Sequence, residues 1–248
     1  MKSEVLRELP PKTENVRRVE LETEQRKLYL AAVVDAREKL RAAKPEDKMT
    51  VFAVLMRLRE ICCDPRLVAD NWTGSSAKLE ACLELVTEAV AGGHRILLFS
   101  QFTSMLELLA KRLDEAGVSH FTLQVSTPKP VRAEQVRRFN QGEADVFLIS
   151  LRAGGTGLNL TAADIVIHYD PWWNVAAQDQ ATDRAHRIGQ QHTVTVYKLI
   201  AKDTIEERIM QMQESKRDLV NSVLGGDGIS SALFTREDVL ALLGGDGR

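Results

Sequence analysis

The stretch Asp145-Val-Phe-Leu-Ile-Ser-Leu-Arg-Ala-Gly-Gly-Thr-Gly-Leu-Asn-Leu160 decides the fold that we expect for this chain of 248 residues. Its first six residues form a short apolar run, which is typical of a strand buried on both faces of a parallel sheet. Three glycines and a threonine follow, and they allow the backbone to approach a phosphate or a base closely. A glycine cluster alone is often only a tight turn, but its place directly after a buried strand makes this one more specific.

Short apolar runs and amphipathic helices alternate along the chain on both sides of this stretch. We expect strands at residues 95–100, 119–124, 145–150, 164–169 and 193–200, and helices at residues 78–91, 103–116, 131–140, 176–186 and 203–224. This alternation predicts βαβ units and a mainly parallel sheet. Because ligands of such sheets bind outside the carboxyl ends of the strands, the segments after Ser100, Ser150 and Tyr169 are candidate binding loops.

The first 75 residues have a different, more helical pattern. Residues 16–22 alternate weakly as one strand, and a helix is expected at residues 23–43 with Thr23 as its N-cap. A second helix is expected at residues 48–63, where Asp64-Pro65 ends it. The polar segment 71–76 marks a boundary, so we divide the chain into residues 1–75, 76–224 and 225–248.

Bulk composition narrows the class of protein only moderately. The formal net charge of −2 gives no general attraction to nucleic acid, so any DNA-binding surface must be a local patch. The three cysteines have no metal-ligand spacing and are expected to be buried thiols of an intracellular protein. No signal-peptide pattern is visible near Met1, and no apolar segment approaches membrane-spanning length.

Two arginines lie three residues apart in the segment Gln180-Ala-Thr-Asp-Arg-Ala-His-Arg-Ile-Gly-Gln190. On the predicted helix this spacing aims the guanidinium groups of Arg184 and Arg187 the same way, as suits the charge that develops on a transferring phosphoryl group. Taken alone, a solvated helix face is an equally good interpretation. No G-x-x-x-x-G-K-[ST] loop occurs in the sequence, so we expect the chain to hold half of a phosphate-handling site.

Two of the three tryptophans, Trp172 and Trp173, are neighbours just after the expected strand 164–169. Adjacent side chains on a helix or strand cannot share one buried face. We interpret the pair as a platform against a nucleic-acid groove. The alternative is one core tryptophan beside one half-exposed tryptophan that covers it.

Four segments occur in the order of the later helicase motifs, namely residues 100–102, 153–160, 170–174 and 180–190. Together they resemble the second RecA-like lobe of the Swi/Snf family of double-stranded-DNA-translocating ATPases, in helicase superfamily two. Residues 9–12, 25–29 and 58–65 resemble the lobe-linking segment and helical protrusion of that family. The resemblance covers residues 9–224. It implies an α/β, RecA-like three-layer domain of the P-loop NTPase type, with residues 1–75 as linking segment and helical insertion and residues 225–248 as a tail.

The resemblance also implies roles for particular residues. Arg184 and Arg187 match phosphate-contacting positions, with Arg187 as the arginine finger, and Gln180, Gly155 and Gly157 match positions near the nucleotide. Residues that match positions at the DNA are Ser100, Gln101, Arg132, Arg152, Thr156, Trp173 and Asn174.

The same resemblance implies partners and a cofactor. ATP and Mg²⁺ would be held mainly by a first RecA-like lobe, whose phosphate loop and magnesium carboxylates do not occur in this sequence. The implied partners are that lobe, double-stranded DNA and a DNA-bound target protein. The implied location is the cytoplasm or nucleoid of a prokaryote, or the nucleus of a eukaryote, and no metal site is expected within the chain itself.

Two residues depart from the family pattern. Val125 stands where a glycine usually precedes a Ser-Thr turn, and a valine adopts positive φ only at a cost. Val175 stands where a proline usually follows Trp-Trp-Asn, which removes a favourable first helical residue.

Three functions remain open at this point. We expect a motor lobe that has negligible ATPase activity alone. A standalone DNA- or protein-binding module that keeps the fold without the chemistry is the second possibility. An RNA-remodelling helicase lobe is the third, and Trp172-Trp173 with Arg187-Ile-Gly-Gln190 argue against it by resemblance.

Overall fold

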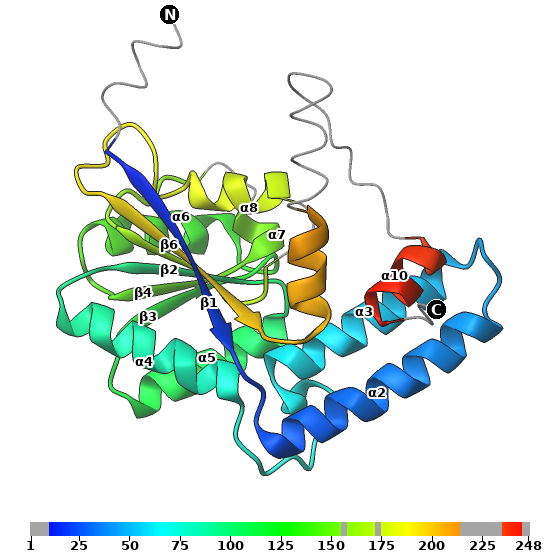
Figure 1. Cartoon of the computed structure of the whole chain (residues 1–248). Helices are drawn as coiled ribbons and strands as arrows, with labels where there is room; N and C mark the ends of the chain where they lie inside the picture. The colour runs from blue at the N-terminus through cyan, green and yellow to red at the C-terminus, as the bar shows by residue number, and fades with distance from the viewer. Residues whose placement is uncertain (1–9, 155–157, 172–174, 214–234, 245–248) are drawn as a thin grey trace, which may run out of the picture. The chain divides into compact units, whose positions relative to one another are not determined.

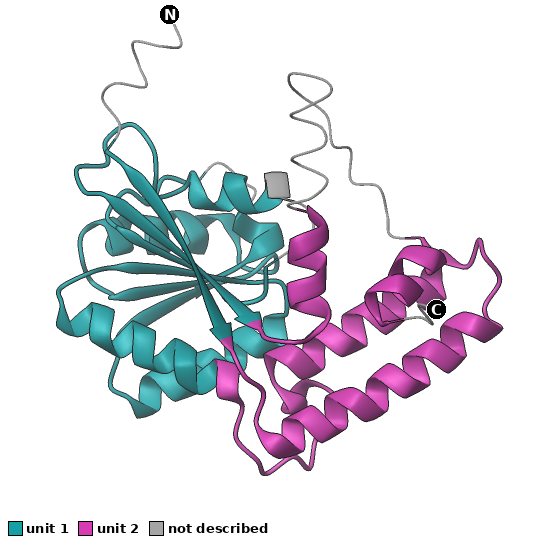
Figure 2. Ribbon diagram, viewed as in Figure 1, with its two compact units in different colours: residues 1–18, 79–200 teal, residues 19–78, 201–248 magenta. Residues whose placement is uncertain are grey.

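The computed structural model describes residues 10–154, 158–171, 175–213 and 235–244. The chain divides into two compact units, which Figure 2 shows in teal and magenta. Unit 1 comprises Met1–Arg18 and Leu79–Ile200, and unit 2 comprises Val19–Lys78 and Ala201–Arg248. Each unit therefore combines segments that are far apart in the sequence.

Unit 1 is built on a sheet whose strands follow the order β1-β6-β5-β2-β4-β3. The strands are β1 (Lys12–Val19), β2 (Ile96–Ser100), β3 (His120–Leu123), β4 (Val146–Ser150), β5 (Ile165–His168) and β6 (Val194–Ala201). Four of the neighbouring pairs are parallel, namely β3 with β4, β4 with β2, β2 with β5, and β5 with β6. β1 runs alongside β6 in the same direction, because Val194 donates to the carbonyl of Pro11 and Lys202 donates to that of Val19. The predicted α/β fold with a parallel sheet is confirmed.

Helices cover both faces of this sheet. In Figure 1, α4 (Ala77–Ala91) and α5 (Thr103–Glu115) lie below the strands, and α6 (Lys129–Asn140), α7 (Leu151–Gly154) and α8 (Val175–Thr182) lie above them. Every residue of β2, β4 and β5 is buried, as the continuous apolar runs predicted. Phe99, Phe139 and Phe147 belong to the apolar core that fills the space between β-strands and helices.

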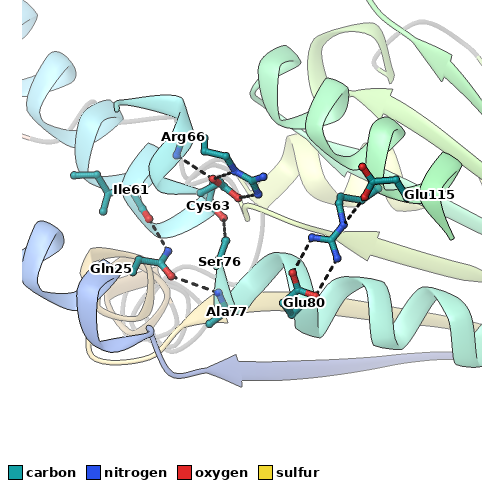
Figure 3. A network of polar contacts seen from close by, with 10 residues as sticks. Gln25, Ile61, Cys63, Arg66, Ser76, Ala77, Glu80 and Glu115 are labelled. Atoms are coloured by element: carbon teal, nitrogen blue, oxygen red, sulfur yellow. Dashed lines mark hydrogen bonds and ion pairs between the residues drawn. The ribbon is translucent and has the colours of Figure 1, made fainter. Parts of the chain in front are cut away.

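Unit 2 contains the helices α2 (Thr23–Ala42), α3 (Lys48–Cys63) and α10 (Arg236–Leu242), the 3-10 turn η1 (Pro65–Leu67) and helical residues 205–213. Buried polar bonds fasten its parts, as Figure 3 shows. The side chain of Gln25 donates to the carbonyl of Ile61 at 2.9 Å and accepts from the N–H of Ala77 at 3.4 Å. Ser76 donates to the carbonyl of Cys63 at 2.9 Å.

An ion pair is buried in unit 2 between Lys78 and Glu206, whose side chains are 0% and 2% exposed. The ammonium nitrogen lies 2.7 and 2.5 Å from the two carboxylate oxygens, and the carboxylate also accepts from the N–H of Ala201 at 2.9 Å. Burial opposes the charged ammonium, but the attraction of Glu206 outweighs it and holds the pKa of Lys78 above its usual value. At Cys62, burial disfavours the charged thiolate and therefore raises the pKa of the thiol.

The element boundaries show where local sequence reasoning succeeds. α2 and α3 lie within one residue of the expected ends. The N-cap prediction for Thr23 is wrong, because Glu22 occupies the N-cap position and Thr23 is the first helical residue. α7 was not predicted at all, since its four residues are too few for a helical pattern to be visible. Among the described residues, no helix is both long enough and apolar enough to cross a membrane.

Candidate functional site

Residues 184–190, which we call the arginine turn, follow α8 rather than continue it. α8 ends at Thr182, so the prediction of a helix through residue 186 is wrong. The inference that helical spacing aims both guanidinium groups the same way fails with it. Arg184 is only 8% exposed, whereas Arg187 is exposed to solvent. The two arginines are therefore placed in different environments.

Tertiary hydrogen bonds explain why the helix stops. The backbone carbonyl of Arg184 accepts from the N–H of Leu160 at 3.0 Å, and the carbonyl of Ala185 accepts from the side-chain amide of Gln190 at 3.1 Å. A continuing α-helix would need both carbonyls for N–H groups four residues further along. Gly189 completes the turn with φ of +104°, which only glycine adopts without strain.

The side chain of Gln190 fastens the arginine turn to its surroundings. Its Nε2 donates to the carbonyls of Ala163 at 2.7 Å and Ala185 at 3.1 Å. Its Oε1 accepts from the N–H groups of Gln191 at 2.8 Å and His192 at 2.9 Å. All four hydrogen-bonding positions of this buried amide are used, which makes the turn rigid. The sequence pattern alone did not indicate this role.

The arginine turn lies beside the amino-terminal ends of the strands. Gln190 is bonded to Ala163, two residues before β5, and the Nε2 of His186 lies 2.8 Å from the carbonyl oxygen of Pro10, two residues before β1. A helix between two parallel strands carries the chain back from the carboxyl end of one to the amino end of the next. The carboxyl-edge rule therefore locates the loops that follow the strands, but it does not locate the arginine turn.

The guanidinium group of Arg184 is buried and incompletely bonded. Its Nε has no hydrogen-bond partner among the described residues. Within residues 10–154, 158–171, 175–213 and 235–244, neither Arg184 nor Arg187 forms an ion pair. A buried cation without a counter-charge is costly, and an anion from outside would relieve that cost. Local neutralisation of both arginines, which would have argued against phosphate binding, is not found in the described part of the chain.

The carboxyl ends of the strands hold a second group of polar residues. Ser100 at the end of β2 lies beside Ser150 at the end of β4, and both are buried. The hydroxyl oxygen of Ser100 accepts from the N–H of Phe102 at 3.1 Å, so it is engaged within its own turn. The hydroxyl of Ser150 has no hydrogen-bond partner among the described residues.

Asp170 ties the carboxyl end of β5 to that of β2. Its buried carboxylate accepts from the backbone N–H of Gln101 at 3.0 and 3.2 Å. The sequence analysis quoted Asp170 only as the start of the tryptophan segment. An acidic residue directly after a buried strand was the available signal that this side chain accepts hydrogen bonds at the edge of the sheet.

Three further predicted residues lie at or near this edge. Arg152 is exposed on α7, directly after β4, and the half-buried Arg132 lies in the first turn of α6, after β3. Gln180 is exposed on α8, which follows β5. The structure therefore brings Ser100, Gln101, Arg132 and Arg152 to one edge of the sheet, although they come from three separate parts of the sequence.

The two departures from the family pattern cause no local strain. Val125 does not have positive φ, since Asp203 is the only non-glycine residue of the described chain that does. Its turn is closed instead by the N–H of Gln124, which donates to the hydroxyl of Thr127 at 3.0 Å. α8 begins at Val175, so the helix forms without the proline. The predicted site residues Gly155, Thr156, Gly157, Trp173 and Asn174 lie outside the described residues.

Sequence reasoning missed one bond that holds α8 on the sheet. The Nε2 of His168, at the end of β5, lies 3.0 Å from the hydroxyl of Thr182, the last residue of α8. The imidazole stacks on Phe99 at 5.6 Å between ring centroids. Burial, with a smaller contribution from the charge of Lys198, lowers the pKa of His168 to about 3. A histidine in an otherwise apolar strand was the available signal.

We expect His168 to make stability depend on pH. The fold keeps this imidazole neutral, whereas the unfolded chain binds a proton below its ordinary pKa of 6.5. Stability is therefore complete above pH 6.5 and is lost as the pH falls toward 3. The difference at pH 5 should be about 2 kcal/mol relative to pH 7. Urea unfolding at both pH values should show this loss in wild type but not in His168→Gln, and equal losses in the two proteins would contradict the assignment.

Comparison with known proteins shows the family of the chain. The helicase conserved C-terminal domain family matches residues 77–189, and the SNF2-related domain family matches residues 1–67. The chain is 39% identical over 242 residues to an uncharacterized ATP-dependent helicase of Mycoplasma pneumoniae. This alignment covers 97% of this chain and 23% of that protein. The chain belongs to the SNF2 family and corresponds to the helicase C-terminal lobe of that family.

Solved structures of the family have the same fold. The C-terminal domain of the Sulfolobus solfataricus SWI2/SNF2 ATPase superposes with a TM-score of 0.72 at 27% identity, covering 88% of this chain and 91% of that one. The ATPase core of that protein in complex with double-stranded DNA gives a TM-score of 0.74 at 30% identity, covering 90% of this chain and 48% of that one. The chain spans about a quarter of the length of the curated relatives it matches.

Proposed function

We propose that this chain is the second motor lobe of an ATP-dependent translocase that moves along double-stranded DNA. In this function ATP and Mg²⁺ are bound chiefly by a first RecA-like lobe, and the arginine turn completes the site from the side of this lobe. Arg187 acts as the arginine finger that stabilises charge on the transferring phosphoryl group, and Arg184 contacts the phosphates beside it. Without a first lobe, turnover is negligible.

One observation carries the phosphate part of the proposal. Arg184 is buried, and within the described part of the chain its Nε has no hydrogen-bond partner and no carboxylate neutralises it. Buried charges in proteins are normally paired, so this arrangement fits a site that is completed by an anionic ligand. The turn is also rigid, because Gln190 and Leu160 hold its backbone. Rigid donors aimed at a phosphate stabilise developing charge without reorganisation.

The DNA part of the proposal rests on the carboxyl edge of the sheet. Arg132, Arg152 and Gln101 lie there, and the bond from Gln101 to Asp170 fixes the loop after β2. Contacts of this kind grip the phosphate backbone without reading the sequence, as a translocating motor requires. A motor that moves along DNA meets other proteins bound to the same DNA, and we propose such a protein as its target. The related ATPase core that was solved with double-stranded DNA supports this choice of partner.

Turnover of ATP with and without a first lobe tests the proposal. The 248-residue chain alone should show no DNA-stimulated hydrolysis, and the same chain supplied with a first lobe that carries a phosphate loop should hydrolyse ATP faster when duplex DNA is added. Robust hydrolysis by the chain alone would refute the division of the site. Duplex binding without any restored turnover would instead support a non-catalytic DNA-binding module, and separation of RNA strands would support the RNA-remodelling alternative.

A further inference from the structure

Pro10 and Pro11 lie immediately before β1 and can only accept hydrogen bonds, because proline has no backbone N–H. The structure uses both of their carbonyl groups. The carbonyl of Pro11 accepts from the N–H of Val194 at 3.1 Å, at the start of β6. The carbonyl of Pro10 lies 2.8 Å from the Nε2 of His186. Since a carbonyl oxygen only accepts, the imidazole is the donor.

We propose that His186 is a positioning residue that holds the arginine turn in register with the segment linking the two motor lobes. This inference rests on the proposed function. His186 stands between Arg184 and Arg187 in the sequence, so a displacement of its side chain moves the backbone that carries both arginines. The segment at Pro10 is the part of the chain through which, by resemblance, the first lobe is covalently attached.

The bond of His186 differs from the other bonds of the arginine turn in what it reaches. Leu160 and Ala163 belong to the loop before β5, so the bonds of Arg184 and Gln190 fix the turn within its own lobe. The His186 bond instead spans 176 positions of sequence to reach the linking segment. Proline fixes φ, and a residue before proline is restricted to extended conformations, so Pro10-Pro11 is a stiff attachment point. A rotation of the linking segment is thereby transmitted to the arginine turn.

Hydrogen exchange tests the bond without requiring any activity. In the 248-residue chain, His186→Ala should speed exchange of the backbone amides in residues 183–192 by about two- to twelve-fold, the range that corresponds to the loss of one hydrogen bond. His186→Gln should keep nearly wild-type exchange, because its amide N–H can reach the same carbonyl. His192→Ala is the matched control, since that imidazole is exposed, and it should change nothing.

A double-mutant cycle identifies the acceptor. A chain that begins at Pro11 lacks the carbonyl of Pro10 and should show the same faster exchange as His186→Ala. Combining the two changes should add nothing further, because both remove one bond. Additive effects, unchanged exchange in His186→Ala, or faster exchange throughout the whole sheet would overturn the proposal.

Turnover in the presence of a first lobe tests what the bond does for the motor. His186→Ala should lower kcat by about ten-fold with less than a two-fold change in KM for ATP, because misplaced arginines stabilise the transition state less while ground-state binding remains. His186→Gln should restore kcat. Equal kcat in wild type and His186→Ala would overturn the coupling role. Loss of the proposed function itself would appear differently, as no turnover in wild type while the exchange results stand.

Discussion

Replacing Arg187 by alanine should lower ATP turnover by about 10³–10⁵-fold when the chain is supplied with a first lobe. The guanidinium of Arg187 is exposed and free of ion pairs among the described residues, so it is available to a nucleotide held by another lobe. The effect should lie in kcat, because the contact strengthens as charge develops on the phosphoryl group. Steady-state hydrolysis in the presence of saturating duplex DNA measures it.

Arg137→Ala is the matched control for this prediction. Arg137 is also exposed, but it lies on α6 and pairs with Glu134 at 2.6 Å on the surface. Its loss should change turnover less than two-fold and stability by under about 1 kcal/mol. Equal activities of Arg187→Ala and Arg137→Ala would remove Arg187 from the catalytic site and favour a lobe that binds DNA without hydrolysing ATP.

Replacing Lys78 by methionine should destabilise the chain by about 3–5 kcal/mol. The substitution keeps the length of the side chain but leaves the buried carboxylate of Glu206 without its counter-charge. Adding Glu206→Gln should recover part of the loss, because a neutral amide oxygen can still accept from the N–H of Ala201. Urea unfolding at pH 7 measures each free energy.

The same substitution at an exposed ion pair provides the control. Lys39 pairs with Asp35 four residues away on α2 at 2.8 Å, and their side chains are 57% and 49% exposed. Lys39→Met should change the free energy of unfolding by less than about 1 kcal/mol. If Lys78→Met were as mild as Lys39→Met, the buried ion pair would not be a main contributor to the stability of unit 2.

The sequence predicted those features that depend on local periodicity and burial. The apolar runs at β2, β4 and β5 are buried along their whole length. The helix α5, which was expected from its amphipathic pattern, ends within one residue of the expected position. The candidate site residues were assigned by resemblance, and their roles stay a prediction. Periodicity alone could not place them, because it carries no information on contacts between distant segments.

The errors share a physical cause. The helix expected through residue 186 ends at Thr182, because the carbonyls of Arg184 and Ala185 are bonded to Leu160 and Gln190 rather than along the helix. Tertiary hydrogen bonds therefore override the local helical preference after Thr182. The structural roles of His168, Asp170 and Gln190 were missed because each depends on a partner distant in sequence or on a turn.

The central claim is that the arginine turn contacts the phosphates of a nucleotide held by another lobe. Association of the 248-residue chain with a first lobe should be measured in the presence of ADP alone and of ADP with aluminium fluoride, which mimics the transferring phosphoryl group. The account predicts at least ten-fold tighter association with the mimic, and the gain should disappear in Arg184→Ala and Arg187→Ala. Equal affinities in the two nucleotide states, or an unchanged gain in both variants, would contradict it.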